Sequence, residues 1–556
     1  MKQYLQDCVK ASLTSLGLTQ IPVLTFEKPR ITGHGDLTTN IAMVMAKSLR
    51  MPARQVAQNI VDHLEIDSTL VDRIEIAGSG FINFHFTDEF YRKQLTEILQ
   101  QGRDFGRLNL GNRKKTQVEF VSANPTGPLT VGHGRGAVYG DTIARLLEWT
   151  NYDVTREYYF NNAGRQMRIL GDSVRLRYLE LLGEKIDFPQ EHYQGEYIKD
   201  IALHLKERYG HTLRDNPPEG IFKEYAEQEI FDDIKKTLLR LNIKHDVYYN
   251  ENSLYESGKV NEVISELRKK GLAYDQDGAV WFKASSLGIE KDKVIMKSTG
   301  EPTYRLPDIA YHREKFRRGF ELMIDVLGAD HVATYPDVLA GLNALGYDPS
   351  CVKVLIHQFV TIVQDGEVVK MSTRKANFIT LDELIDEVDA DVVRYFFLMR
   401  SIGSHLNFDL KLAKEQSEAN PVYYLQYAHA RIASIIRHAE SLGINPQVVG
   451  DLSLPVRRIP QSGTEGKLVE REELELMKML ANFPDVVESC ATTYEPHRLA
   501  EYLHDVAGCF HKFYHVHRVV TDDQQLTAAR IALCLGTKTV LANGFSILGI
   551  SAPMKM

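Results

Sequence analysis

Hydrophobic and polar positions alternate differently in successive parts of the chain. Between residues 116 and about 407, short apolar runs alternate with longer stretches of helical periodicity, as expected of an open parallel sheet with helical crossovers. The strand-like runs of this part are 117–121, 279–282, 323–327 and 352–356. From residue 420 onward nearly everything has helical periodicity, apart from a Pro- and Gly-bearing stretch at 443–466. We therefore predict an α/β core followed by a helical bundle.

The first hundred residues have the pattern of a small α/β unit. Helices are expected at 1–16, at 41–49 and after Pro52, and alternation across 74–86 predicts strands joined at a glycine turn. A further helix over 87–101 precedes a polar, glycine-containing segment at 102–115, which we interpret as a linker. The predicted domains are 1–108, 109–419 and 420–556, and the middle domain contains a helical insertion at about 167–250 and a loop region at about 360–419.

Composition limits the classes of partner and compartment. A formal charge of −8 over 556 residues gives no general attraction for nucleic acid, so such a partner must be held by local basic patches. Five scattered cysteines without a Cys-x-x-Cys pair argue against a disulfide framework or a zinc ribbon, and indicate a reducing compartment. Residues 1–19 show no secretory signal and no window approaches about 18 uncharged apolar residues, so we expect a cytoplasmic protein without a membrane span.

A glycine-rich helix start follows the first strand of the core. The segment Ser122-Ala123-Asn124-Pro125-Thr126-Gly127-Pro128 leads to Thr130-Val131-Gly132-His133, which opens a helix over 132–149. A helix N-terminus presents backbone N–H groups to an anion. Four glycines, at 132, 134, 136 and 140, cost roughly 1 kcal/mol each in a helix interior. Either they allow tight packing on the sheet, or Gly132 lets an adenine lie on the backbone while His133 donates to a phosphate.

A second polar segment lies more than two hundred residues later. Lys370-Met371-Ser372-Thr373-Arg374 follows Asp365-Gly366 and precedes Thr380, a plausible helix N-cap whose capping box is completed by Glu383. Lys370 and Arg374 are suited to neutralise phosphate charge that grows in a transition state. A solvated charged loop is the alternative interpretation of this segment alone. Together, the two segments predict one split nucleotide site.

These two segments resemble the HIGH and KMSKS signatures of class I aminoacyl-tRNA synthetases, and further blocks narrow the resemblance to the arginyl-tRNA synthetase family. The match spans practically the whole chain in the right order. Its blocks are 122–128, Arg156-Glu157-Tyr158-Tyr159, 161–166, Thr303-Tyr304 with 308–312, the run 420–431 and the closing Leu548-Gly549-Ile550-Ser551-Ala552-Pro553.

The resemblance implies ligation of L-arginine to its tRNA through an arginyl-adenylate, with ATP and its Mg²⁺ as cofactors. It implies catalytic roles for His133, Thr130, Lys370, Ser372 and Arg374. It places ATP on Gly132, His133, Gly328, Asp330, His331, Val360, Lys370 and Met371, with Asp330 accepting from the ribose hydroxyls. The chain departs from the signatures at Thr130 and Thr373, where His and Lys are expected. Arg374, Lys375 or Lys370 must then supply the missing charge, and we hypothesise that Arg374 contributes.

Recognition of arginine requires a carboxylate facing a guanidinium. The resemblance assigns this role to Asp308, together with Tyr304; without it, Asp308 would be interpreted as an acid complementing a helix dipole. Ser122 and Asn124 resemble residues that hold the amino acid. Tyr158, Asn162 and Gln166 are expected to complete the pocket. The insertion is too small for a separate editing domain.

For tRNA(Arg), the resemblance implies an elbow contact by the N-terminal domain near Gly35-Asp36 and anticodon contacts by the C-terminal bundle. Tyr423, Tyr427, Arg431 and Arg498 are the expected tRNA-binding residues, since rings and cations stack on splayed bases. A monomer without membrane contact is expected. One rival is a non-catalytic RNA-binding paralogue, which would have lost His133, Lys370 or Asp308. Another is an ATP-dependent ligase acting on a small amine or thiol, against which the tRNA-binding tail argues.

Overall fold

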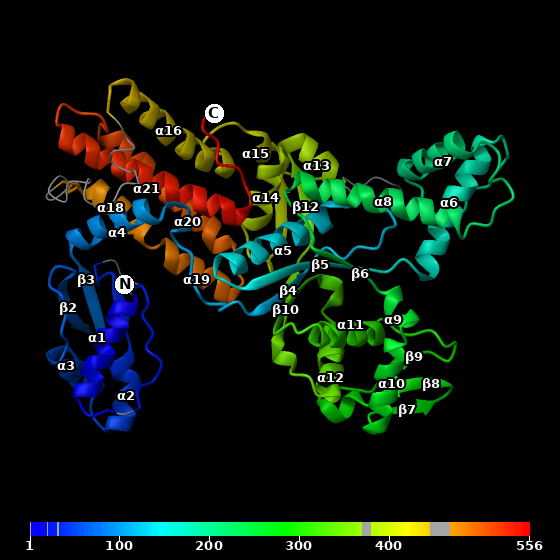
Figure 1. Ribbon diagram of the computed structural model, residues 1–556, viewed down its shortest axis with the longest axis horizontal. Helices are drawn as coiled ribbons and strands as arrows, with labels where there is room; N and C mark the ends of the chain where they lie inside the picture. The colour runs from blue at the N-terminus through cyan, green and yellow to red at the C-terminus, as the bar shows by residue number, and fades with distance from the viewer. Residues whose placement is uncertain (1, 19, 30–32, 370–379, 445–466) are drawn as a thin grey trace.

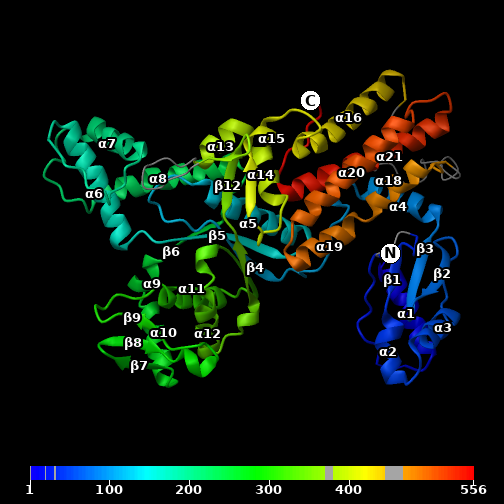
Figure 2. The same cartoon turned by 180° about the vertical axis from the view of Figure 1, so that it is seen from behind.

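The computed structural model describes residues 2–18, 20–29, 33–369, 380–444 and 467–556. Lys370, Met371, Ser372 and Arg374 lie outside the described residues. Figures 1 and 2 show a central α/β core, a helical arm on one side of it, a helical bundle on the other, and a small N-terminal domain below the bundle. The predicted fold class is thereby confirmed.

The centre of the core is a five-stranded sheet in the order β11-β10-β4-β5-β6. All of its pairings are parallel. Its strands are β4 Lys115–Glu119, β5 Asp153–Phe160, β6 Val247–Asn250, β10 Leu322–Gly328 and β11 Val352–His357. The chain leaves β4 toward β5 on one side and later returns as β10 on the other, so the crevice at the carboxyl ends of β4 and β10 is a topological switch point. Helix α5 (Val131–Trp149), almost wholly buried, begins in this crevice.

The apolar run at 279–282 belongs to a different sheet from the one predicted. It forms β8 (Ala279–Phe282), which pairs antiparallel with β7 (Ala273–Gln276) and β9 (Lys293–Met296). The prediction that it continues the parallel sheet is therefore wrong. A run of four apolar residues fits a parallel or an antiparallel sheet, so its sequence pattern could not decide between the two. This subdomain has a separate hydrophobic cluster. Its helices are α9 Asn252–Glu256, α10 Lys259–Lys269, α11 Arg305–Arg317 and α12 Tyr335–Leu345, with short 3-10 turns η2 Ala284–Leu287, η3 Ala329–His331 and η4 Pro349–Cys351.

The helical insertion forms the projecting arm of Figures 1 and 2. It consists of α6 Gly164–Leu181, α7 Glu196–Tyr209 and α8 Ile221–Arg240. The predicted insertion of about 167–250 extends too far, because β6 within it is the edge strand of the parallel sheet.

A second, three-stranded sheet follows β11. It contains β12 Val360–Gln364, β13 Glu367–Val368 and β14 Leu406–Asp409, in the order β13-β12-β14. Helices α13 Leu381–Val388, α14 Ala390–Leu398 and α15 Leu410–Lys414 accompany it. The predicted capping box is confirmed, since Glu383 N–H donates to Thr380 Oγ1 (3.1 Å) and Thr380 N–H to Glu383 Oε2 (2.7 Å).

The N-terminal domain has the predicted helices and hairpin. Its antiparallel sheet has the order β1-β3-β2. The elements are α1 Lys2–Ser15, β1 Leu37–Thr39, α2 Ile41–Leu49, α3 Ala53–Asp62, β2 Val71–Ala77 and β3 Phe81–Phe86. The next helix, α4 (Asp88–Gln101), is capped by Thr87 and packs on helices of the C-terminal bundle.

The segment 102–115 is a packed connection, although its polar composition had indicated a linker. After the 3-10 turn η1 (Gly102–Asp104), Phe105 is 3% exposed and stacks on Phe483 of the bundle. Asn543 Nδ2 donates to the carbonyls of Gly102 and Phe105, both at 3.0 Å. These contacts fix the first part of the segment to the bundle.

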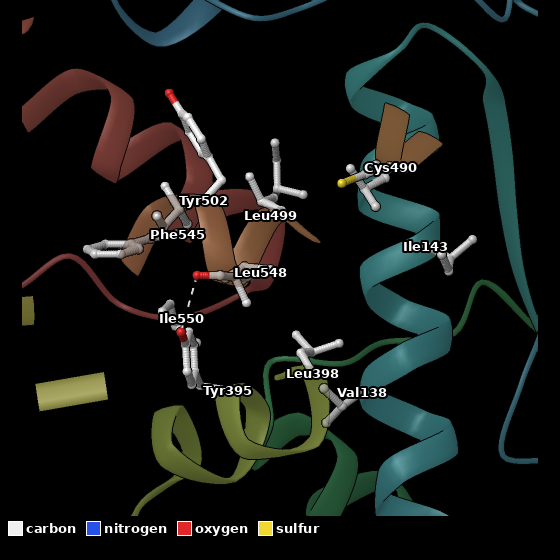
Figure 3. Packing of buried hydrophobic residues seen from close by; sticks show 14 of the residues in the cluster. Val138, Ile143, Tyr395, Leu398, Cys490, Leu499, Tyr502, Phe545, Leu548 and Ile550 are labelled. Carbon is white, nitrogen blue, oxygen red and sulfur yellow. Dashed lines mark hydrogen bonds between the residues drawn. The ribbon is translucent and has the colours of Figure 1, made fainter. Parts of the chain in front are cut away.

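The C-terminal bundle contains α16 Pro421–Ser441, α18 Arg471–Ala481, α19 Phe483–Thr493, α20 His497–Val516 and α21 Gln524–Leu548. Figure 3 shows the hydrophobic cluster between the catalytic core and the bundle. In it, Val138 and Ile143 of α5 lie near Leu398 of α14, Cys490 of α19 and apolar side chains of α20 and α21. Within the described residues, α21 alone is long and apolar enough to cross a membrane, a possibility that the sequence interpretation missed. Of its most apolar window, 72% is buried inside the fold, as in a core helix.

Candidate nucleotide and amino-acid site

Thr130 and His133 form a hydrogen-bonded unit at the start of α5. Thr130 is the N-cap, and its N–H donates to His133 Nδ1 at 3.2 Å. Burial lowers the pKa of His133, and the Asp330 carboxylate opposes this only in part. The ring is therefore neutral at pH 7, and because Nδ1 accepts a hydrogen bond the ring proton resides on Nε2. Nε2 is left to donate to a ligand.

The glycines of α5 separate into two kinds. A Cβ at Gly134 would lie 2.6 Å from Leu381 Cδ1, and one at Gly140 would lie 2.3 Å from Phe120 Cγ. Gly136 approaches His357, with 3.0 Å to Nε2. A Cβ at Gly132 would meet only Thr130 Oγ1, at 3.6 Å. Tight packing therefore explains three of the four glycines, while the face of Gly132 is open to a ligand.

The end of α5 that faces the crevice meets the residues that follow the second signature. Thr130 pairs with Thr380 in an antiparallel bridge, and Leu381 N–H donates to Leu129 O at 2.8 Å. Thr380 is the first described residue after 370–379. The chain that follows the second signature, from Thr380 onward, thus meets the N-terminus of α5, and the joint site of the two signatures stays a prediction.

The carboxyl ends of β10 and β11 line the same crevice. Gly328 ends β10, and a Cβ there would lie 2.7 Å from Asp330 Oδ1. Asp330 and His331 are exposed, with His331 Nε2 3.8 Å from Asp330 Oδ2. At the end of β11, burial and the Arg135 cation lower the pKa of His357 to about 4. Val360, which is buried, starts β12 three residues after His357.

Arg135 helps to hold the elements around the site together, and the sequence analysis did not identify it. Its guanidinium is fully buried and donates to the carbonyls of Gln358 (2.9 Å), Ser404 (2.8 Å) and Ser401 (2.9 Å). It holds the first turns of α5 to Gln358, between β11 and β12, and to the loop between α14 and β14.

The loop after β4 is strained where it enters the site. Val121 and Ser122 have φ values of 70° and 46°, left-handed conformations that are costly for a β-branched residue. Ser122 Oγ donates to Glu119 Oε1 (3.1 Å) and accepts from Tyr159 N–H (3.2 Å). Asn124 Nδ2 donates to Gln166 Oε1 at 3.0 Å. Three of the residues predicted to hold arginine therefore lie on or beside one loop.

Two of the predicted arginine-binding residues lie beside this loop with their polar groups occupied. Tyr158 is fully buried, and its hydroxyl donates to Ala123 O at 2.8 Å. Asn162 Nδ2 donates to Glu227 Oε1 of α8 at 2.7 Å. This placement fits support of the loop and the insertion, and a direct contact of either side chain with arginine stays a prediction.

Asp308, near the start of α11, has a carboxyl group that forms an ion pair with no described residue. Within the described part of the chain its side chain makes no hydrogen bond or ion pair. Burial raises the pKa of Asp308 to about 7; the positive charges of His312 and Lys315 oppose this shift, and the carboxylates of Glu251 and Glu119 add to it. Tyr304, one turn earlier, is 82% exposed at the N-cap of α11. A cation that binds beside Asp308 would stabilise the ionised form of its carboxylate.

Sequence reasoning also missed Tyr159 and Glu251. The Tyr159 hydroxyl is buried without a hydrogen-bond partner among the described residues, and its ring stacks on Tyr311 at 4.2 Å. Glu251, just after β6, accepts from Asn161 Nδ2 (2.9 Å) and Tyr255 OH (3.0 Å), and burial raises its pKa. Burial raises the pKa of the Tyr159 hydroxyl well above its usual range, and the Glu251 and Asp308 carboxylates add to this. Strand alternation could have found Tyr159, because it faces the opposite side from Tyr158.

A buried network of ion pairs lies next to Asp308. Lys315 Nζ, fully buried, bonds Glu119 Oε2 (2.6 Å) and Asp325 Oδ1 (2.7 Å). His312 Nε2 bonds the other oxygen of Asp325 at 2.7 Å. Lys315 is thus occupied by Glu119 and Asp325, and no described residue pairs with the carboxylate of Asp308.

The bundle gathers rings and cations at two places. Tyr423 and Tyr427 stack at 6.2 Å, and Tyr427 stacks on His511 at 5.9 Å. Arg431 lies over the ring of Tyr514 at 5.0 Å, beside a cavity of about 430 Å³. Arg498 is half-exposed and pairs with Glu495 at 2.7 Å.

The comparisons with known proteins agree with this geometry. Residues 3–86 match the arginyl-tRNA synthetase N-terminal domain, 94–395 the catalytic domain of class I (R) tRNA synthetases, and 425–556 the DALR anticodon-binding domain. The chain is 52% identical to the arginine–tRNA ligase of Desulfotalea psychrophila over 96% of its own length and 94% of that protein. It is 49% identical to that of Chlorobium phaeobacteroides over the whole of both chains.

The chain belongs to the arginyl-tRNA synthetase family. The arginyl-tRNA synthetase of Thermus thermophilus has the same fold, with a TM-score of 0.74 over all of both chains at 21% identity. Membership of class I implies the use of ATP. Arginine, ATP and tRNA are the partners that family membership implies. The chain has Thr130 and Thr373 where the class I signatures have His and Lys.

Proposed function

We propose that this protein joins L-arginine to tRNA(Arg) in two steps. In the first, an oxygen of the arginine carboxylate attacks the α-phosphorus of ATP, and the bond to pyrophosphate breaks. In the second, the arginyl group passes from the adenylate to the terminal adenosine of the tRNA, and AMP leaves. Such a reaction needs reactants held in line and stabilisation of growing phosphate charge, without a covalent enzyme intermediate.

The observation that carries the choice of amino acid is the unpaired carboxylate of Asp308. It shares its surroundings with Glu251 and with the unpartnered hydroxyl of Tyr159. A guanidinium offers five N–H donors in a planar fork, enough for two carboxylates and a hydroxyl. An uncharged analogue would leave the Asp308 carboxylate unpaired, so the pocket can discriminate without editing. We assign Ser122, Asn124 and Gln166 to contacts with the amino and carboxylate groups of arginine. We assign Tyr304 to a contact with its side chain.

The nucleotide is assigned to the crevice at the start of α5. Gly132 leaves room for the adenine, and the proton on His133 Nε2 is suited to a phosphate oxygen. Gly328, Asp330, His331 and Val360 line the ribose and base side. Lys370, Met371, Ser372 and Arg374 are assigned on sequence grounds, and Arg374→Ala is expected to slow pyrophosphate exchange.

Mg²⁺ is proposed to enter with ATP. Within the described residues no group of three or more His, Cys, Asp or Glu side chains is arranged to hold a metal. The phosphates are therefore the main ligands we assign to the ion, in keeping with its usual habit of binding substrate phosphates and few carboxylates.

The tRNA is assigned to the bundle and the N-terminal domain. Tyr423, Tyr427, Arg431 and Arg498 provide rings and cations on or beside α16 and α20. The cavity beside Arg431 also has His438, Tyr514, His517 and Arg518 in its lining, a cationic and aromatic set suited to one nucleotide. We propose that the protein acts as a cytoplasmic monomer.

The test is ATP–pyrophosphate exchange with each amino acid in turn, with and without total tRNA. Exchange that depends on arginine alone among the amino acids supports the proposal. Absence of exchange together with tight tRNA binding would favour a non-catalytic RNA-binding paralogue. Exchange with arginine followed by transfer to a small amine, and no transfer to tRNA, would favour a ligase of a different class.

A further inference from the structure

The helical insertion touches the loop that carries Asn124. The hydroxyl of Tyr197, on α7, donates to Thr126 O at 2.8 Å. A Cβ at Gly127 would lie 2.9 Å from the same hydroxyl oxygen, so this approach needs the glycine. A side chain from the arm in Figures 1 and 2 thus holds the loop on the arginine side of the site.

The insertion also reaches the nucleotide side, through the last turn of α8. Arg240 Nη1 bonds Asp382 Oδ1 at 2.5 Å, and its other terminal nitrogen bonds Asp386. The hydroxyl of Thr237 bonds the second oxygen of Asp382. Asp382 lies in the first turn of α13. Arg240 therefore bridges the end of the insertion to this short helix.

The first turn of α13 in turn rests on the first turn of α5. Leu381 N–H donates to Leu129 O, and the side chain of Leu381 lies in the space left by Gly134. Thr380 pairs with Thr130, whose N–H orients His133. A shift of Asp382 would therefore be transmitted through two residues to the phosphate-facing histidine.

We propose that Tyr197 and Arg240 are positioning residues, through which the insertion sets the two halves of the site independently. Tyr197 acts on arginine binding through the Thr126 carbonyl, and Arg240 acts on ATP binding through α13. Neither is assigned a substrate contact. The inference rests on the proposed function, because it assigns arginine to the loop and ATP to the start of α5.

The experiment measures the KM of each substrate in pyrophosphate exchange for Tyr197→Phe and Arg240→Gln. Arg240→Gln is expected to raise the KM for ATP about 3- to 10-fold and to change the KM for arginine less than about 2-fold, since hydrogen bonds to charged groups have effects of this size. Tyr197→Phe is expected to raise the KM for arginine and to change the KM for ATP less than about 2-fold. Arg240→Lys, which keeps the charge, is expected to recover part of the ATP affinity.

The insertion itself offers matched controls. The Tyr178 hydroxyl donates to Gly210 O at 2.7 Å, and Arg214 pairs with Glu184 at 2.9 Å, both within the arm. Tyr178→Phe and Arg214→Gln lose the same kinds of bond without touching the site. Both are expected to leave the two KM values unchanged.

A double-mutant cycle separates positioning from general loosening. Asp382→Asn alone should raise the KM for ATP, and adding Arg240→Gln should add little because the same bridge is already broken. Equal changes in both KM values, a matching effect in the control variants, or additive effects in the cycle would overturn the proposal. Failure of the unmodified protein to exchange pyrophosphate with arginine would instead refute the proposed function.

Discussion

At the scale of single residues, the charge state of Asp308 determines whether the pocket can receive a cation. Its pKa of about 7 means that the free carboxylate is protonated at lower pH and ionised at higher pH. We predict that the KM for arginine rises as the pH falls from 8 to 6, because only the ionised form pairs with a guanidinium. Pyrophosphate exchange at fixed saturating ATP across this range measures it.

Asp308→Asn provides the comparison for this prediction. The variant should bind arginine at least about 100-fold more weakly, in line with a lost charge-assisted pair of roughly 3 kcal/mol, and it should lose the pH dependence. Glu321→Gln, a change at an acid remote from the pocket, should keep both the affinity and the slope. An unchanged slope in Asp308→Asn would assign the titration to another group.

Some of the residues at the arginine side of the site could be predicted from the sequence, and others could not. The resemblance and the chemistry of guanidinium recognition were enough to single out Asp308. Glu251, however, follows an edge strand more than fifty residues earlier, and only the parallel pairing of β6 with β5 brings it toward Asp308. Local sequence carries no signal for that approach. Alternation along β5 does distinguish the two tyrosines, but burial decides which face is the pocket.

At the scale of elements, α5 contains glycines with opposite consequences. Gly140→Ala places a methyl group against Phe120 and should destabilise the protein by about 1–3 kcal/mol, a usual cost of overpacking. Gly132→Ala meets no neighbour closer than 3.6 Å and should keep or raise stability, while raising the KM for ATP. Thermal unfolding and pyrophosphate exchange on both variants check this. Loss of stability in Gly132→Ala would show that packing explains all four glycines.

We predict that His245 lowers the stability of the protein in acid. It lies 4.2 Å from the Phe120 ring, neither ring nitrogen has a partner among the described residues, and burial lowers its pKa to about 4. The unfolded chain takes up a proton at this residue near pH 6.5, so the stability is present above that pH and is lost as the pH falls toward 4. At pH 5.5 the loss is about 1 kcal/mol.

The corresponding variant is His245→Phe, measured by chemical unfolding at pH 7.5 and pH 5.5. It should show a smaller loss of unfolding free energy between the two pH values than the unmodified protein. His211→Gln, at an exposed position, should reproduce the unmodified behaviour. Equal losses in all three proteins would show that other groups cause the acid sensitivity.

Errors in the predicted elements share a physical cause. Periodicity gave the helices of the N-terminal domain and the strands of the parallel sheet, because each buries one face in a regular way. The run 279–282 was placed in the wrong sheet, since pairing depends on partners that periodicity does not identify. The polar segment 102–115 is held by Asn543 and Phe483, which come from the far end of the chain. Composition describes a segment but not what covers it.

At the scale of the whole molecule, Arg394 joins the core, the insertion and the bundle. Its buried guanidinium donates to Asp141 of α5 (2.7 Å), to Leu241 O after α8 (2.6 Å) and to Leu548 O at the end of α21 (2.9 Å). A Cβ at Gly549 would lie 2.3 Å from Arg394 Nη2, so the chain end is shaped around this side chain. One residue therefore fixes three blocks that are far apart in sequence.

We predict that Arg394→Lys destabilises the protein by about 3–5 kcal/mol, because a single ammonium cannot replace the planar donors and leaves buried acceptors unpaired. Calorimetry should show the bundle and the catalytic core unfolding in separate transitions, whereas we expect a single shared transition in the unmodified protein. Arg530→Lys is the matched control, since Arg530 pairs with Glu473 at 2.7 Å inside the bundle. It should lower the stability of the bundle without separating it from the core. A single shared transition in Arg394→Lys would show that the apolar contacts of Figure 3 couple the two blocks without this arginine.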